Sequence, residues 1–229
     1  MNQLNSVQQI KMSEQITKIL PKSAWQKIII HENNDPLVEV KKFFRIKRGL
    51  IPVAHKAAYF VRKQVAEKLI QASEQLPEGI NLVLIEGYRP LNIQKKLWDS
   101  EFQKIKNKNP SLTIEKIKAQ LKLIVAKPAP LANHHCGGAI DITLAYSDNS
   151  LMDMGPYILQ TATDKNTFPM FSEHITEAQT KNRKILRDAM VASGFVWYPG
   201  EWWHYCWGDR MWAVYTNQIE CFYGPIEIN

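Results

Sequence analysis

The 229-residue sequence has little cysteine and no long apolar run. Its three cysteines, Cys136, Cys206 and Cys221, are an odd number without CxxC spacing. This pattern excludes a disulfide framework and favours a reducing compartment. No stretch approaches the roughly 18 apolar residues of a membrane span, and the first twenty residues lack the apolar core of an export signal. We therefore expect a cytoplasmic protein with no membrane association.

Acidic residues are too few to balance the basic ones. The chain has 29 Lys and Arg against 22 Asp and Glu, a formal net charge of +7. Residues 41–63 hold eight of the positive charges and residues 95–127 hold nine, which leaves 12 basic and 19 acidic residues elsewhere. Neither stretch has an aromatic–basic motif of nucleic-acid-binding folds. We interpret both stretches as solvated surface and expect no nucleic-acid partner.

The spacing of apolar residues predicts one α+β domain, since no fixed-period repeat or linker divides the chain. Residues 1–36 are predicted to be an N-terminal helical arm or extension, and residues 37–229 to be the domain itself. Helices are predicted at 57–76, 91–106, 113–125 and 178–192, the last one ended by Gly194. Strands are predicted at 37–46, 81–86 and 139–144, and in the aromatic-rich segment after Gly194.

Two clusters of titratable residues are candidates for chemistry. One is HHCGGAID at 134–141 and the other is EWWH at 201–204. Zinc binds histidine nitrogen and carboxylate oxygen, and a catalytic zinc site offers three protein ligands and one open position. His134, Asp141 and His204 would supply these three ligands.

Both clusters need a local bend to bring their side chains together. His134 and Asp141 are seven residues apart, a separation that points side chains to opposite faces of a strand. The two glycines between them permit a tight turn with positive φ. Glu201 and His204 are three apart and converge only on a turn or bulge, for which the preceding Pro199-Gly200 pair is suited.

Other ligand sets stay open at this point. His135 adjoins His134 and could be the ligand in its place, and Cys136 and Cys206 lie close to the clusters without CxxC pairing. The remaining histidines have no partner at ligand spacing, and we interpret them as hydrogen-bonded structural residues: His31, His55 and His174.

The two clusters, together with the upstream Gly87-Tyr88-Arg89-Pro90, resemble the VanX-type D-alanyl-D-alanine dipeptidases. These are zinc D,D-peptidases that share a fold with the Hedgehog signalling domain. The resemblance covers roughly residues 50–210 and consists of three separated motifs in the right order. It implies a central, mainly antiparallel sheet with flanking helices, and a catalytic domain of this type over 37–229.

The resemblance also implies residue roles. His134, Asp141 and His204 would bind one zinc ion per chain, in preference to His135. Glu201 would be the general base and acid, and Arg89 would stabilise the transition state. Zinc lowers the pKa of a bound water, and a nearby carboxylate can take its proton. The implied reaction is hydrolysis of D-alanyl-D-alanine, or a similar small D-dipeptide, in cell-wall precursor or peptidoglycan turnover.

Substrate contacts are expected from Glu86, Tyr88 and Trp203. The sequence departs from the family pattern at three places that concern the substrate. Ala132 replaces a serine, Glu86 replaces an aspartate, and residues 156–159 (PYIL) replace a Phe-Asp pair. Two carboxylates are candidates to replace the missing one, Asp153 and Asp164.

Two other functions are compatible with the same residues. One is a D,D- or L,D-carboxypeptidase acting on peptidoglycan stem peptides, which the lack of an export signal disfavours. The other is a zinc-stabilised binding domain without catalysis, which the presence of both Glu201 and Arg89 disfavours. The sequence leaves the oligomeric state open, and a homo-oligomer is compatible with it.

Overall fold

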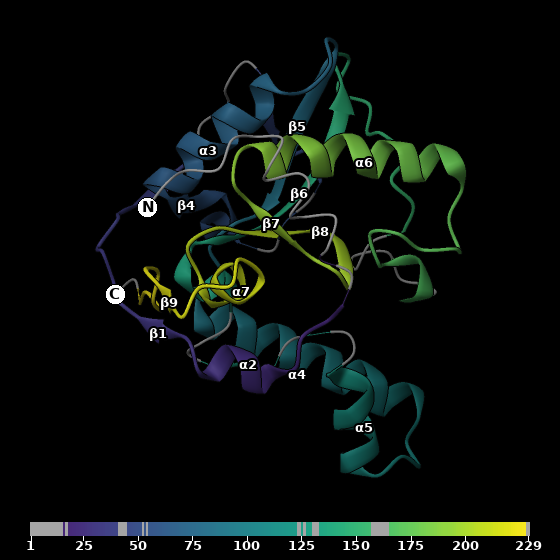
Figure 1. The fold of residues 1–229 in the computed structure, drawn as a ribbon. Helices are drawn as coiled ribbons and strands as arrows, with labels where there is room; N and C mark the ends of the chain where they lie inside the picture. The colour runs from purple at the N-terminus through teal and green to yellow at the C-terminus, as the bar shows by residue number, and fades with distance from the viewer. Residues whose placement is uncertain are drawn as a thin grey trace.

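A five-stranded sheet forms the centre of the protein (Figure 1). The structure is a computed structural model that describes residues 16, 18–40, 45–51, 53, 55–122, 125, 127–129, 133–156 and 165–227. The strand order is β3-β5-β6-β8-β7, with β3 and β5 parallel and the other neighbours antiparallel. The strands are β3 (Ile46–Arg48), β5 (Ile80–Glu86), β6 (Ala139–Tyr146), β7 (Val196–Tyr198) and β8 (Glu201–Cys206). The predicted α+β fold with a mainly antiparallel sheet is confirmed.

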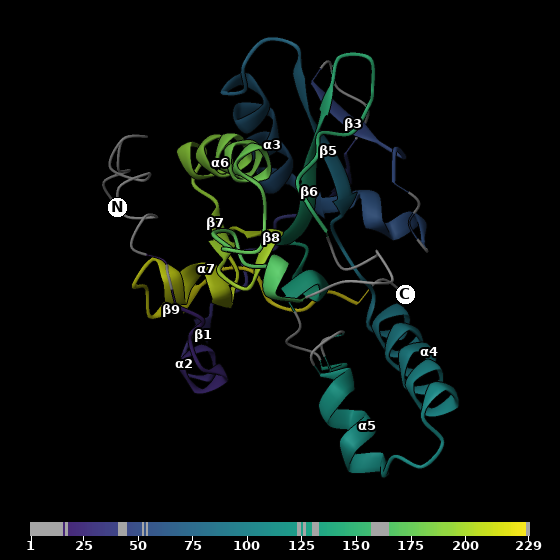
Figure 2. The same cartoon turned by 90° about the vertical axis from the view of Figure 1, so that its right-hand side faces the viewer.

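Two helices lie side by side against one face of this sheet, α3 (Lys63–Glu74) and α6 (Glu177–Ala192) (Figure 2). On α3, Val65, Leu69 and Ala72 form the buried stripe that their helical spacing predicts. The C-terminal end of α6 is followed by Gly194 at φ +92°, the left-handed conformation expected of a glycine after a helix.

A helical hairpin projects from the body of the molecule (Figures 1 and 2). It consists of α4 (Leu91–Lys108) and α5 (Ile114–Leu121). The nine lysines of residues 95–127 are all exposed to solvent, which agrees with the interpretation of this stretch as solvated surface. The helix predicted over 113–125 ends at Leu121, four residues early.

Shorter elements complete the fold. Strand β1 (Ile29–Ile30) pairs in parallel with β9 (Glu220–Cys221), and β2 (Leu37–Glu39) pairs in antiparallel with β4 (Phe60–Arg62). The remaining helices are α2 (Lys22–Gln26), α7 (Arg210–Tyr215) and the 3₁₀ turns η1 (Lys56–Tyr59), η2 (Asn133–Cys136) and η3 (Lys165–Thr167). In the described part of the chain, no helix has the length and apolar character needed to cross a membrane.

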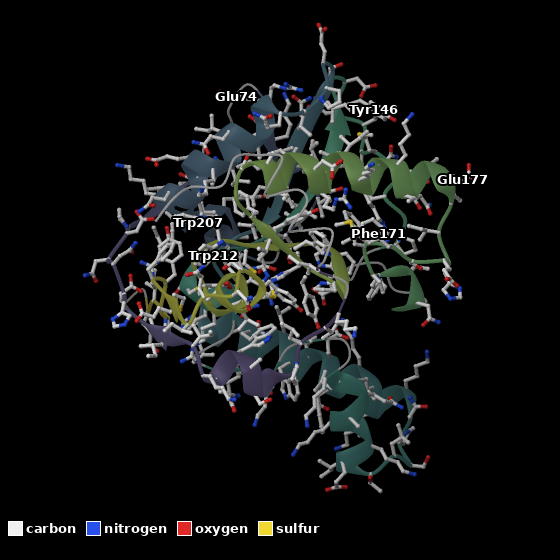
Figure 3. All side chains as sticks on the ribbon, in the orientation of Figure 1. Glu74, Tyr146, Phe171, Glu177, Trp207 and Trp212 are labelled. Carbon is white, nitrogen blue, oxygen red and sulfur yellow. The ribbon has the colours of Figure 1, made fainter. Side chains whose placement is uncertain are left out.

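Aromatic side chains connect α3 with the segment before α7. Trp207 and Trp212 lie beside one another (Figure 3), with ring centroids 6.3 Å apart. The Lys68 ammonium group of α3 lies 4.7 Å from the centroid of the Trp207 ring. This cation–π contact joins the helical layer to the C-terminal part of the domain.

Some sequence predictions of secondary structure were wrong or incomplete. The helix predicted over 57–76 begins only at Lys63, because Phe60–Arg62 pairs with Leu37–Glu39 as strand β4. Val61 is 0% exposed in this pairing, so tertiary contacts outweigh the local helical spacing. The aromatic-rich segment after Gly194 contains helix α7 as well as the predicted strands. Of the strand predicted over 37–46, residues 41–44 lie outside the described residues.

The described part of the N-terminal segment packs against the domain. The Ile29 amide donates to the Ile219 carbonyl, and Glu32 forms an ion pair of 2.9 Å with Arg62. Arg62 belongs to the stretch interpreted as solvated surface, yet it is 2% exposed and also donates to the carbonyls of Cys136 and Gly224. The interpretation is therefore wrong for this arginine. The boundary at residue 36 stays a prediction, and residues 1–15 lie outside the description.

Candidate active site

Asp141 and His204 are brought together by strand register. They are directly opposite one another in the antiparallel pair of β6 and β8. Opposed residues on such strands have Cβ atoms about 5 Å apart. Here the His204 Nδ1 atom lies 2.9 Å from the Asp141 Oδ1 atom.

His134 reaches the same point from outside the strand, on turn η2. Gly137 ends this turn at φ +72°, and a Cβ atom at this position would lie 2.6 Å from the Leu37 Cδ2 atom. The positive φ favours glycine here, as the sequence predicts, whereas the flexible Leu37 side chain could move aside. The His134 Nε2 atom lies 3.4 Å from Asp141 Oδ1. Its Nδ1–H donates to the Gly87 carbonyl at 2.8 Å, which fixes the ring and leaves Nε2 free to bind a metal.

These three side chains fit a zinc ion. Their candidate ligand atoms all lie within 4.8 Å of one another, and all three side chains are buried. Tetrahedral zinc with bonds of about 2.0 Å places its ligand atoms about 3.3 Å apart, close to the two separations from Asp141 Oδ1. Within the described ranges, no other group of three His, Cys, Asp or Glu side chains meets this criterion. Two nitrogens and one oxygen are the donor set of a catalytic zinc site.

The alternative ligands are not part of the convergent group. The His135 ring is buried and stacks on Tyr88, with centroids 5.9 Å apart. All three cysteines are free and buried, and burial raises the pKa of the Cys136 and Cys206 thiols. Neither His135 nor the cysteines belong to the cluster of convergent ligand atoms.

Charges in the cluster are strongly coupled. Burial alone would raise the pKa of Asp141, but the charges and hydrogen bonds of His134 and His204 lower it well below its usual range. Burial would lower the pKa of His204, but the hydrogen bond and charge of Asp141 raise it instead. Asp141 is therefore ionised in the folded protein, as a metal ligand must be.

Glu201 lies at a bulge in β8 and interacts electrostatically with His204, Asp141 and His134. Trp197 is opposite Tyr205 and Tyr198 is opposite Glu201, so residues 202–204 have no partner on β7. The irregular strand that the Glu201–His204 spacing requires is thus confirmed. Burial raises the pKa of Glu201, and although the charge of His204 lowers it, the net direction is upward.

Arg89 lies at the end of β5, in the loop before α4. Its Nε–H donates to Glu86 Oε1 at 2.7 Å, one Nη donates to Glu86 Oε2, and the other donates to Gln94 Oε1 at 2.7 Å. Burial would lower the pKa of Arg89, but Glu86 raises it through a hydrogen bond and its charge, and the charges of Asp141 and Glu201 add to this. The Arg89 guanidinium therefore interacts electrostatically with Asp141 of the metal cluster and with Glu201.

Two further residues of this hydrogen-bond network were not predicted from the sequence, one bonded to Arg89 and the other to Glu86. Gln94 is buried in the first turn of α4, and His55 lies before η1 with its Nε2 atom 2.8 Å from Glu86 Oε1. Spacing carries no signal for the His55–Glu86 contact, because the two residues are 31 positions apart on separate elements. Gln94 follows Arg89 by five positions and lies in the first turn of a predicted helix. This proximity in sequence is a signal that could have identified its amide as a partner of Arg89.

The predicted substrate contacts have different surroundings. Glu86 is bonded to Arg89 and His55, whereas Tyr88 and Trp203 are buried in the protein core. The Tyr88 hydroxyl donates to the Ile226 carbonyl, and Trp203 packs edge-on against Phe168. Substrate binding by these three residues stays a prediction.

Of the two carboxylates predicted to replace the acid of the family's Phe-Asp pair, the structure describes Asp153. Asp153 accepts two hydrogen bonds of 3.0 Å from the Gln179 side chain at the start of α6. Ala132, Asp164 and residues 157–159 lie outside the described residues.

Comparison with known proteins agrees with this geometry. The M15 peptidase family model, described as D-ala-D-ala dipeptidase, matches residues 47–225. The chain belongs to this family. A D-alanyl-D-alanine dipeptidase of Synechocystis sp. is 28% identical over 202 residues, which are 75% of this chain and 81% of that protein. A D-alanyl-D-alanine dipeptidase of Enterococcus faecalis is 32% identical over 133 residues, which are 56% of this chain and 62% of that protein.

Among solved structures, the LdcB LD-carboxypeptidase is similar with a TM-score of 0.47 and 17% identity, over 88% of this chain and 90% of that chain. This likeness is too low to support any functional argument. The M15 family assignment therefore rests on the sequence match, and the metal cluster on the geometry of the chain itself.

Proposed function

We propose that this M15 family member is a zinc-dependent dipeptidase that hydrolyses D-alanyl-D-alanine or a similar small D-configured dipeptide. The convergence of His134, Asp141 and His204 on one point, in the same electrostatic environment as Glu201 and Arg89, carries the proposal. The substrate follows from the family, whose relatives are D-alanyl-D-alanine dipeptidases.

One proposed metal ligand, His134, is held by a second contact. In the proposed enzyme, His134, Asp141 and His204 would hold the zinc ion. Bound zinc would supply Lewis acidity, which polarises a carbonyl and makes water nucleophilic at neutral pH. The Gly87 carbonyl holds the His134 ring by its Nδ1–H, so that the ligand atom is oriented before any metal arrives.

Glu201 is the proposed general base and acid. Its carboxylate would take a proton from the attacking water and give it to the departing amine nitrogen. A raised pKa suits the first step, because a carboxylate with a higher pKa accepts a proton from water more readily than one with a low pKa. Removal of this proton carrier would stop turnover without removing a metal ligand.

Arg89 is the proposed stabiliser of the negative charge that develops on the peptide oxygen. Its guanidinium keeps its charge at all relevant pH values. The hydrogen bonds to Glu86 and Gln94 fix its orientation before substrate binds, so that no reorganisation is needed during the reaction.

Release of D-alanine tests the proposal. The zinc-loaded protein should release D-alanine from D-Ala-D-Ala, with little release from L-Ala-L-Ala or from a stem pentapeptide. A Glu201→Gln variant, which keeps all three metal ligands, should contain the same zinc and be inactive. Release from the pentapeptide alone would replace the dipeptidase with a carboxypeptidase, and zinc binding without any hydrolysis would indicate a binding domain.

A further inference from the structure

His55 is a half-buried residue outside the metal cluster, and its ring has one specific contact among the described residues. Its side chain is 8% exposed, and its Nε2 atom lies 2.8 Å from Glu86 Oε1. A carboxylate only accepts hydrogen bonds, so Nε2 must carry the proton. The other ring nitrogen, Nδ1, is buried without a hydrogen-bond partner in the described part of the chain. The one polar interaction of this ring is therefore aimed at Glu86.

Glu86 in turn determines where Arg89 points. Its Oε1 atom accepts from both His55 Nε2 and Arg89 Nε, while its Oε2 atom accepts from an Nη of Arg89. With the bond to Gln94, described residues take three of the five N–H groups of Arg89 and leave two for a ligand. A rotation of the Glu86 carboxylate would move these two free N–H groups.

The backbone around this network is fixed independently of the His55 ring. The Gly87 amide donates to the Ala58 carbonyl at 2.6 Å, and the Tyr88 amide donates to the Phe60 carbonyl at 2.7 Å. The Arg89 amide donates to the carbonyl of His134, itself a candidate metal ligand. The loop that carries Arg89 is thus attached on both sides by main-chain bonds. What the His55 ring adds is the orientation of the Glu86 side chain.

We propose that His55 is a positioning residue that orients Arg89 through the carboxylate of Glu86. The consequence for catalysis rests on the proposed function, in which Arg89 stabilises the transition state. The positioning of Arg89 by His55 does not depend on the proposed function, because it concerns only the His55–Glu86–Arg89 contacts. None of these contacts of His55 is with a metal ligand, so zinc binding should not depend on His55.

A double-mutant cycle tests the catalytic consequence. His55→Ala should lower kcat for D-Ala-D-Ala about tenfold, the lower range for a hydrogen bond to a charged group. KM and zinc content should change little, because Arg89 acts on the transition state. His55→Gln retains an N–H donor and should restore most of the lost rate. In an Arg89→Ala background, His55→Ala should cause no further loss.

The matched control is His31→Ala, which removes an exposed histidine whose ring is 3.4 Å from Glu220. It should leave kcat unchanged. An equal loss from His55→Ala with and without Arg89 would overturn the proposal, because His55 would then act by another route. Thermal unfolding of each variant identifies a loss that comes from misfolding, and the His55→Gln comparison remains decisive if His55→Ala does not fold.

A spectroscopic arm separates this inference from the proposed function. With ¹⁵N-labelled arginine, the Nε–H signal of Arg89 can be assigned by its loss in Arg89→Lys. His55→Ala should shift it and speed its exchange with water, while His55→Gln and His31→Ala should preserve it. An unchanged signal in His55→Ala overturns the inference even in an active enzyme. If the wild-type protein has no peptidase activity but His55→Ala still shifts the Arg89 Nε–H signal, only the proposed function is overturned.

Discussion

The buried metal cluster and the projecting α4–α5 hairpin use charge in opposite ways. The cluster combines His134 and Asp141 with the distant His204, and every one of these side chains is buried and in contact with another. The hairpin carries seven of the nine lysines of residues 95–127, all of them exposed, against three acids. Its ion pairs, such as Lys95 with Asp99, form between neighbours on one helix.

This difference shows why the net charge of +7 says little about function. Residues 128–229 contain six Lys and Arg against 11 Asp and Glu, so the half of the chain that provides the metal ligands is acidic. An exposed charge interacts mainly with water, whereas a buried one must have a partner. We therefore expect large effects from substitutions in the cluster and small ones in the hairpin.

The largest effect is expected for Asp141→Asn. Loss of this carboxylate removes the central ligand and should abolish zinc binding and lower kcat/KM by about three orders of magnitude or more. Zinc content and D-Ala release measure the two losses. The matched control is Asp99→Asn on the exposed hairpin, and similar losses in both variants would remove the distinction between the two regions.

Arg89→Ala should have the next largest effect. Loss of a single group that stabilises an oxyanion typically costs about 10²- to 10³-fold in kcat. The variant should retain zinc, because Arg89 is no metal ligand. Steady-state kinetics together with metal analysis would show this, and near-normal turnover would exclude Arg89 from the mechanism.

Glu86→Gln should change the acid stability of the protein. Burial alone would raise the pKa of Glu86, but hydrogen bonds from Arg89 and His55 lower it from its usual 4.5 to about 2. A lowered carboxyl pKa stabilises the fold above about pH 4.5, and this contribution is lost as the pH falls toward about 2. It amounts to on the order of 3 kcal/mol at about 1.4 kcal/mol per pKa unit.

Urea unfolding at several pH values measures this contribution. The unfolding free energy of the wild-type protein should fall more steeply between about pH 5 and about pH 2 than that of Glu86→Gln, because the amide does not titrate. Parallel curves for the two proteins would show that Glu86 is not stabilised as a carboxylate in the fold.

The smallest effect is expected for Lys95→Ala in the hairpin. The Lys95 and Asp99 side chains are 70% and 57% exposed, and their separation is 2.8 Å. An exposed ion pair of this kind contributes less than about 0.5 kcal/mol. Urea unfolding should show a change within that range, and kcat/KM should not change. A large loss of activity would indicate that the hairpin takes part in substrate binding.

The sequence predicts well those features that depend on local pattern. Strand β5, helix α6 with Gly194 after its end, and the bend at Gly137 follow from residue type and spacing. The M15 family resemblance agrees with the sequence match over 47–225. The same resemblance selects His134 over His135, and the convergent cluster contains His134.

Other features depend on contacts between distant residues and have no local signal. Phe60–Arg62 forms a strand because a partner at Leu37–Glu39 is available. Arg62 is buried because Glu32 and main-chain carbonyls surround its guanidinium. The His55–Glu86 contact likewise arises only when η1 and β5 are packed together.

Zinc titration of the metal-free protein, followed by measurement of D-Ala release, tests the central claim most directly. We expect one zinc ion per chain and hydrolysis of D-Ala-D-Ala that rises in proportion to the zinc bound and disappears with a chelator. Binding of no zinc, or hydrolysis that is unchanged in the metal-free protein, would contradict the proposed metal site.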